Sequence, residues 1–119
     1  MERDSILIVD DEALSNKYME NYFSDYFNVH SATSVSEALV LLENPELDFT
    51  TVVTDYYMEP ETGLELLKWI KEKQPNIKRI MITGYFDNAL SHYIDNKTIQ
   101  NALIKPLEYD VLLELIQEK

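Results

Sequence analysis

The residue best placed for chemistry is Asp55, which ends the apolar part of the stretch TTVVTDYYMEP, residues 50–60. Val52 and Val53 lie between β-branched threonines and predict a buried strand, whereas the residues after Asp55 are typical of a loop. Asp55 is therefore expected at the carboxyl end of a strand, the edge at which open α/β sheets bind ligands. Taken alone, an aspartate in this position could also simply start a turn.

Four further polar residues directly follow other predicted strands. Asp10 and Asp11 follow the first apolar run, Thr83 the fourth and Lys105 the fifth. Each has an ordinary explanation by itself, as a helix cap, a turn residue or a solvated lysine. In a parallel sheet, however, all of these positions lie at the same edge as Asp55, and the separate explanations do not account for that convergence.

Alternating apolar segments supply the scaffold for this edge. The expected strands are 5–9, 27–31, 51–55, 77–82 and 102–104. The expected helices are 13–26, 34–44 behind a capping box of Ser34 and Glu37, 62–73, 86–95 and a last helix opened by Pro106. This alternation predicts one α/β domain over 1–119, a doubly wound parallel sheet of five strands with five helices on its two faces.

The aromatic residues of the first predicted helix are interpreted as structural. Tyr18, Tyr22, Phe23 and Tyr26 recur at helical spacing, so we expect them to be buried or half-buried in the core. Trp69 is expected to pack at the rim of the core.

The composition excludes several classes of protein. With 22 acidic and 10 basic residues the net charge is -12, which argues against direct binding to nucleic acid. No apolar run approaches the roughly 20 residues needed to cross a bilayer, so no membrane segment is expected. The chain has no cysteine, which excludes disulfides and suits a reducing cytoplasm. We therefore expect a cytoplasmic domain.

Carboxylates gathered at one sheet edge repel one another unless a cation lies among them. The expected group is Asp10, Asp11 and Asp55, and because its donors are all oxygens it favours Mg2+. With such an ion present, the Asp55 carboxylate could attack a phosphoryl group. Lys105 would neutralise the phosphoryl oxygens, and the Thr83 hydroxyl would donate a hydrogen bond to them. Together these residues predict an aspartyl-phosphate site.

The order and spacing of these motifs resemble the response-regulator receiver domains of two-component signalling. The resemblance covers essentially the whole chain, from the Asp10-Asp11 pair through DYYMEPETGLELL to Thr83-Gly84 and Lys105-Pro106. It implies a flavodoxin-like sheet with strand order 2-1-3-4-5. It also implies that the protein is not an enzyme with an external substrate, but catalyses only its own phosphorylation and dephosphorylation.

The resemblance assigns a role to each candidate residue. Asp55 would be the phosphoacceptor, Asp11 a direct Mg2+ ligand and Asp10 a ligand acting largely through water. The backbone carbonyl of Tyr57 would be a further ligand. The residues assigned to the phosphoryl group are Thr83 and Lys105.

The implied partners are a sensor histidine kinase or phosphotransfer protein and a downstream output domain or target. The face formed by the fourth helix, fifth strand and fifth helix would carry the output, and a homodimer could form through it. Two departures from the family pattern leave an alternative open, a degenerate receiver that acts only as a docking module. Glu59 stands where the family usually has proline, and Ala102 replaces the aromatic residue of the usual switch.

Two other classes compete with this interpretation. A Mg2+-dependent phosphatase or phosphotransferase could also use an aspartyl phosphate, but it would normally carry an acid where this chain has Tyr57. A flavodoxin-like cofactor binder would need a phosphate-binding first loop rich in glycine, serine or threonine, and the first loop here is acidic. The sequence does not identify the kinase, the signal, the target or the oligomeric state.

Overall fold

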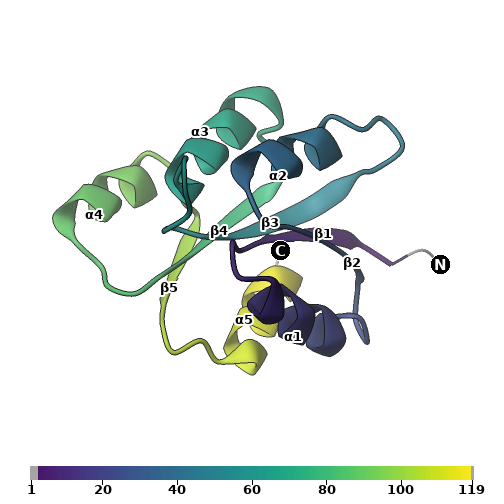
Figure 1. The fold of residues 1–119 in the computed structure, drawn as a ribbon. Coiled ribbons are helices and arrows are strands. Elements are labelled where there is room, and N and C mark those ends of the chain that lie inside the picture. The colour runs from purple at the N-terminus through teal and green to yellow at the C-terminus, as the bar shows by residue number, and fades with distance from the viewer. Residues whose placement is uncertain (1–2, 119) are drawn as a thin grey trace.

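The computed structural model describes residues 3–118, so residues 1–2 and 119 of the expected domain lie outside the described part. Five strands and five helices alternate along the chain (Figure 1). The strands are β1 (Ser5–Val9), β2 (Asn28–Ala32), β3 (Phe49–Asp55), β4 (Lys78–Thr83) and β5 (Asn101–Ile104). The helices are α1 (Ala13–Phe23), α2 (Val35–Leu42), α3 (Gly63–Lys73), α4 (Asn88–Asp95) and α5 (Tyr109–Gln117).

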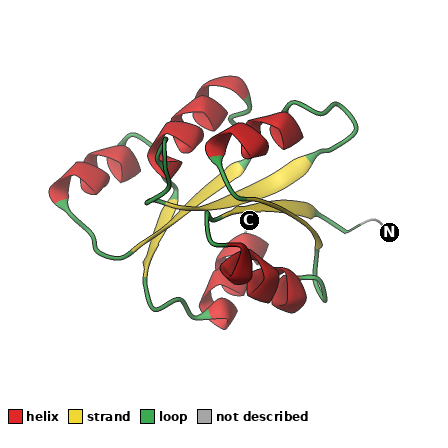
Figure 2. Ribbon diagram, viewed as in Figure 1, coloured by secondary structure: helices red, strands yellow, loops and turns green. Residues whose placement is uncertain are grey.

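The strands form one sheet in the order β2-β1-β3-β4-β5, and every neighbouring pair is parallel. This confirms the predicted doubly wound architecture, with α1 and α5 on one face and α2, α3 and α4 on the other (Figure 2). A hydrophobic core lies on each face of the sheet. Alternate residues of β1 contribute to the two cores, because successive side chains of a strand point to opposite faces. Leu7 packs under α2 and α3, and Ile8 packs against α1 and α5.

The predicted start of α2 is confirmed by its capping contacts. The Glu37 backbone N–H donates to the Ser34 hydroxyl at 3.1 Å. In return, the Glu37 carboxylate accepts a 2.6 Å hydrogen bond from the Thr33 backbone N–H. Two unpaired groups at the helix start are thereby satisfied.

Two other predicted helix starts are wrong. Pro106 does not open α5, because residues 105–108 form a connection in which Leu107 packs against the α1–α5 core, and the helix begins only at Tyr109. The Lys105–Pro106 peptide bond in this connection is cis, and so is the Glu59–Pro60 bond. Helix α4 begins at Asn88 instead of residue 86, because the Asp87 side chain accepts from the Leu90 N–H and caps it there.

The burial expected for two tyrosines is also wrong, since Tyr18 is 57% and Tyr26 is 44% exposed. Helix α1 ends at Phe23, which leaves Tyr26 in the following turn. The buried stripe of α1 consists of Asn16, Met19 and Phe23, so Tyr18 lies beside the stripe. The aromatic residues found half-buried as expected are Tyr22 and Trp69.

Helix α4 is fastened mainly at its carboxyl end. Arg79, a buried residue of β4, donates to four backbone carbonyls, and two of them follow α4. The Lys71 ammonium donates to the Asn96 carbonyl, which ends the helix. Leu90 is the one buried residue among those of α4. The amino end of the helix, after the exposed residues 84–89, has fewer attachments.

Gly63 is required where α3 meets the end of β3. Its backbone N–H donates to the Tyr56 carbonyl at 2.9 Å, which holds the start of α3 against the strand. A β-carbon on Gly63 would lie 2.1 Å from the Asp55 carbonyl oxygen, inside any allowed contact distance. The glycine therefore permits the close backbone approach that supports Asp55.

We predict that Gly63→Ala lowers the free energy of unfolding by about 3 kcal/mol, because the added methyl group must displace backbone. Gly84→Ala is the matched control, since a β-carbon added to Gly84 would meet nothing within 4 Å. It should change stability by less than about 0.5 kcal/mol. Urea unfolding of the two variants decides the point, and equal stabilities would contradict the close approach at Gly63.

Candidate functional site

The predicted site residues do meet at the carboxyl edge of the sheet. Asp55 ends β3 and Thr83 ends β4, while Asp10 and Lys105 directly follow β1 and β5. These four strands are neighbours, and backbone hydrogen bonds continue their pairing past the strand ends. The Lys105 N–H donates to the Thr83 carbonyl at 2.9 Å, and the Tyr56 N–H donates to the Ile82 carbonyl at 2.9 Å.

Three carboxylates form the centre of the site. Asp10, Asp11 and Asp55 each offer an oxygen, and these oxygens lie within 4.8 Å of one another. Asp10 and Asp55 are each only 6% exposed, whereas Asp11 faces solvent. Such a group concentrates negative charge where little water can screen it.

Asp55 has one oxygen engaged and one free. The Lys105 ammonium lies 3.0 Å from Asp55 Oδ2 and donates a hydrogen bond to it. Asp55 Oδ1 is buried and has no hydrogen-bond partner among residues 3–118. A buried acceptor without a partner is costly, so this oxygen is available to a ligand.

The charges of the site also shift the pKa of two of its members. Burial raises the pKa of Asp10, and the neighbouring Asp55 and Asp11 carboxylates raise it further, against the lowering effects of the Glu12 N–H and of Lys105. Burial lowers the pKa of Lys105, but its hydrogen bond to Asp55 and the surrounding carboxylates outweigh that effect, so the net shift is upward. Lys105 therefore stays an ammonium beside Asp55.

Asn16 supports the site, although no sequence motif pointed to it. It is buried in α1, and its side-chain amide donates to the Asp10 carbonyl at 2.9 Å and to the Ala32 carbonyl at 3.1 Å. These bonds fix the turn that carries the first two aspartates. A polar residue inside the buried stripe of a helix was the signal that could have revealed it.

The other candidates lie at the edge of the site. Thr83 is 1% exposed, and its hydroxyl donates to the Tyr85 carbonyl at 3.0 Å. In this state Thr83 is thus bonded to the following loop and not to Asp55. Tyr57 lies in the loop after Asp55 with an exposed side chain, and the buried Met58 anchors that loop in the core.

The site has the composition of a magnesium centre. Its donors are carboxylate oxygens at mutual distances that one cation could bridge, and no described residue donates to Asp55 Oδ1. Mg2+ binds through one or two carboxylates together with waters and phosphate oxygens. The residues present therefore fit such an ion.

Comparison with known proteins identifies the family. The chain matches the response regulator receiver domain family over residues 6–117. It is 30% identical over 115 residues to the hydrogenase transcriptional regulatory protein HoxA of Cupriavidus necator, an alignment that covers 96% of this chain and 23% of HoxA. It is 31% identical over 107 residues to the two-component response regulator ORR5 of rice, covering 87% of this chain and 78% of ORR5.

Solved structures agree with this assignment. A CheY-like response regulator receiver domain protein from Methanospirillum hungatei is 29% identical, with a TM-score of 0.84 over 98% of this chain and 92% of the other. A response regulator receiver protein from Pseudomonas putida is 26% identical, with a TM-score of 0.89 over 100% of this chain and 99% of the other. Both matches span the entire sheet and its carboxyl edge, and the chain belongs to the receiver domains of two-component response regulators.

Proposed function

We propose that this receiver domain accepts a phosphoryl group on Asp55 from the phosphohistidine of a histidine kinase or phosphotransfer protein. The observation that carries the proposal is the state of the Asp55 carboxylate. It is buried and paired with Lys105 at 3.0 Å through one oxygen, and its other oxygen has no partner in the described part of the chain. A positioned carboxylate beside a fixed cation is the arrangement that phosphoryl transfer requires.

In the proposed reaction an Asp55 oxygen attacks phosphorus, and the phosphorus–nitrogen bond of phosphohistidine breaks. The electron pair of that bond returns to the imidazole, and the aspartate becomes an acyl phosphate. Lys105 then neutralises the phosphoryl oxygens, and the Thr83 hydroxyl exchanges its bond to the Tyr85 carbonyl for one to the phosphoryl group. The domain catalyses this transfer and the later hydrolysis on itself alone.

The proposed ligands of Mg2+ are Asp10, Asp11, Asp55 and the Tyr57 backbone carbonyl. When bound, the ion neutralises the crowded carboxylates and the incoming phosphoryl oxygens. Asn16 fixes the turn that presents the first two aspartates. Burial of Met58 anchors the loop that would present the Tyr57 carbonyl.

The proposed partners are a kinase or phosphotransfer protein upstream and an output domain or target downstream. Relatives named as a sensor kinase and as transcriptional regulators contain a domain like this one. This chain spans under a quarter of the length of HoxA, so the activity of such whole proteins is not carried over to it. The proposed output and homodimer face comprises α4, β5 and α5.

The proposed setting is the cytoplasm. Among residues 3–118 no helix is long and apolar enough to span a membrane. The lack of cysteine is compatible with a reducing compartment.

A docking module without phosphorylation is the second candidate. Ala102 is half-buried and pairs with Met81 in the sheet, so the usual switch position offers no ring. The complete carboxylate group and the Asp55–Lys105 pair favour the phosphoacceptor instead.

The first test of this function weighs the intact protein after incubation with Mg2+ and acetyl phosphate. The native chain should gain the mass of one phosphoryl group, and it should gain none in EDTA. Asp55→Ala should gain none while remaining folded, since removal of a crowded carboxylate relieves repulsion. Asp95→Ala removes an exposed carboxylate of α4 and should behave as the native chain. Phosphorylation of the Asp55 variant would refute the assigned acceptor, and its absence from the native chain would favour the docking module.

A second prediction concerns Mg2+ binding without phosphorylation. At a concentration near one hundred times its Kd, Mg2+ should stabilise the native chain against unfolding by about 2.7 kcal/mol, because it binds only the folded state. Asp11→Ala should lose most of this gain. Asp25→Ala, which removes an exposed carboxylate after α1, should keep it. Thermal unfolding with and without Mg2+ measures the effect, and equal gains in all three proteins would remove Asp11 from the ligands.

A third prediction concerns switching in the absence of an aromatic residue at position 102. We expect the conformational change on phosphorylation to occur mainly in residues 83–95. The Thr83 hydroxyl must move, and α4 is weakly held because it buries a single residue. Hydrogen exchange with and without Mg2+ and beryllium fluoride should show its largest difference there. A response limited to the loop after Asp55 would contradict this route.

A further inference from the structure

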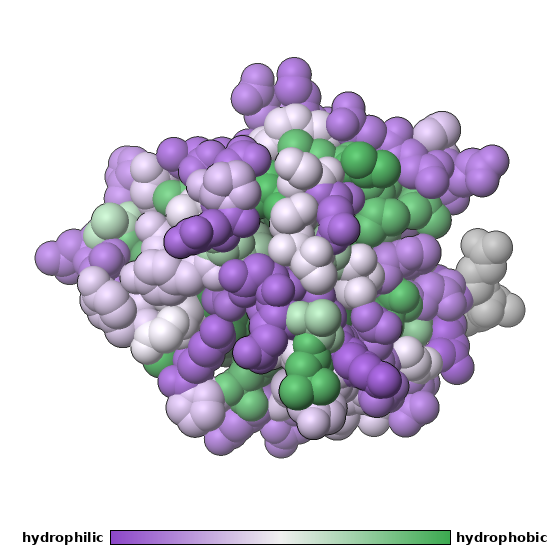
Figure 3. Space-filling view, in the orientation of Figure 1, coloured by the Kyte–Doolittle hydropathy of each residue, from purple (hydrophilic) through white to green (hydrophobic). Residues whose placement is uncertain are grey.

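Asn16 is a polar side chain inside the buried stripe of α1, and its two polar atoms are satisfied unequally. Apolar and hydrophilic side chains are mixed over the surface shown in Figure 3, which is ordinary for a folded domain, whereas a buried polar group needs an explanation. Asn16 is 3% exposed and shares its side of α1 with Met19 and Phe23. Its Oδ1 has no hydrogen-bond partner among residues 3–118. A leucine would leave no buried side-chain oxygen unpaired here, so packing alone does not account for the asparagine.

The orientation of the Asn16 amide follows from its neighbours. The two groups that it meets, the Asp10 carbonyl at 2.9 Å and the Ala32 carbonyl at 3.1 Å, are both acceptors, so the amide nitrogen must face them. The Ala32 carbonyl has a second donor, the Asp10 N–H at 3.1 Å. In the described part of the chain the Asp10 carbonyl has no donor other than Asn16. The amide is therefore needed by the Asp10 carbonyl in particular.

The Asp10 carbonyl belongs to the peptide unit that carries Asp11. A peptide unit is planar, so a hydrogen bond to its carbonyl also fixes the plane that contains the Asp11 nitrogen and α-carbon. Asp10 has attachments of its own, because its N–H donates to the Ala32 carbonyl and its carboxylate accepts from the Glu12 N–H at 2.9 Å. Asp11 is exposed, and its backbone forms no hydrogen bond within residues 3–118. The direction of Asp11 is thus set by the peptide unit before it, which Asn16 holds.

We infer that Asn16 is a positioning residue for Mg2+, which acts through the Asp10–Asp11 peptide unit and directs the Asp11 carboxylate toward the ion. The inference rests on the proposed function, in which Asp11 is a direct ligand. Removal of a group that orients a metal ligand commonly lowers the affinity for the metal by about ten- to hundredfold. Asn16 meets neither the ion nor the phosphoryl group, so it sets the affinity for Mg2+ and leaves the reaction at Asp55 unchanged once the ion is bound.

Asn16→Leu tests this role, because leucine has the branched shape of asparagine but no donor. It should raise the Kd of Mg2+ at least about tenfold in a calorimetric titration of the intact chain. Without Mg2+ the variant should unfold at the same urea concentration as the native chain, because burial of an apolar side chain beside Met19 and Phe23 offsets the lost hydrogen bonds. Asn16→Ala removes the amide without adding volume and should weaken Mg2+ binding to the same extent, so the test does not depend on how well leucine fits.

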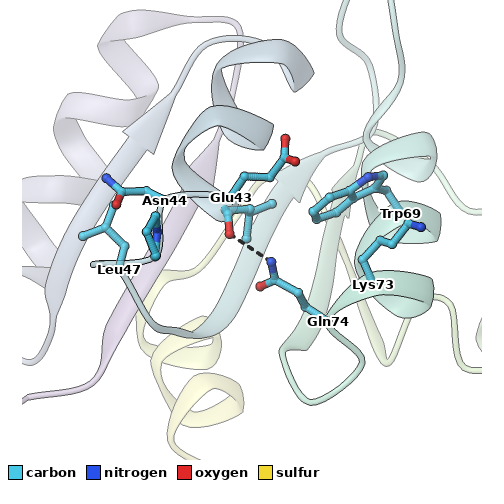
Figure 4. A pocket seen from close by; sticks show the side chains of 8 residues that line it. Glu43, Asn44, Leu47, Trp69, Lys73 and Gln74 are labelled. Carbon is cyan, nitrogen blue, oxygen red and sulfur yellow. Dashed lines mark hydrogen bonds between the residues drawn. The ribbon is translucent and has the colours of Figure 1, made fainter.

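Gln74 provides the matched control. Its side-chain amide also donates to a main-chain carbonyl, that of Leu42, at 2.9 Å (Figure 4). Gln74 follows α3, whose 11 residues lead about 16 Å away from the end of β3. Gln74→Met removes the same kind of hydrogen bond far from the carboxylates and should leave the Kd of Mg2+ unchanged.

The rate of phosphorylation by acetyl phosphate separates positioning from a wider loss of structure. In Asn16→Leu the Mg2+ concentration that gives half the maximal rate should rise in parallel with the Kd, whereas the rate at saturating Mg2+ should equal that of the native chain. A low rate at saturating Mg2+, or equal weakening in Gln74→Met, would overturn the inference.

The outcome also distinguishes this inference from the proposed function. If the native chain binds Mg2+ and both Asn16 variants bind it equally well, the inference is wrong and the proposed function stands. If the native chain does not bind Mg2+, the proposed metal site is wrong and the role of Asn16 is refuted with it.

Discussion

The arrangement of the site depends on the contact between Asp55 and Lys105. It joins the ends of two strands that are 50 residues apart in sequence and not adjacent in the sheet, and it offsets the charge of a carboxylate that burial would otherwise penalise. One oxygen of Asp55 remains without a partner in the part of the chain that the structure describes, beside two further aspartates. The fold therefore keeps this carboxylate oriented and incompletely satisfied, which is the condition for accepting a ligand.

Backbone geometry holds that carboxylate in place. Gly63 lets the start of α3 press against the Asp55 carbonyl, and Asn16 bonds the turn of Asp10 to the end of β2. Neither residue carries a charge or meets the phosphoryl group in the proposed reaction. Both residues hold the site in place through contacts with main-chain carbonyls. The free energy that is lost by burying charge there is offset in part by the stability of the surrounding sheet.

Much of this arrangement could be predicted from the sequence, because strand and helix patterns alternate clearly and the polar groups fall at strand ends. The convergence of Asp10, Asp55 and Lys105 follows from that alternation alone. The sequence does not predict which face of α1 is buried, because the helix carries apolar residues on several sides. Periodicity alone does not separate the exposed Tyr18 from the buried Met19. The start of α5 was missed because a proline suits a first helical turn as well as a connection, and only tertiary packing distinguishes the two.

Helix α4 is attached to the rest of the fold mainly at one end, which determines how it could move. Arg79 and Lys71 hold carbonyls just beyond its last turn, so the carboxyl end is held to the fold and the end nearer Thr83 has fewer attachments. An eight-residue helix is about 12 Å long, so a displacement of about 2 Å at the end nearer Thr83 rotates its axis by about 10°. If the Thr83 hydroxyl exchanges its hydrogen bond as proposed, this attachment would convert the exchange into a change of angle. A binding partner on α4 would then sense an orientation instead of a distance.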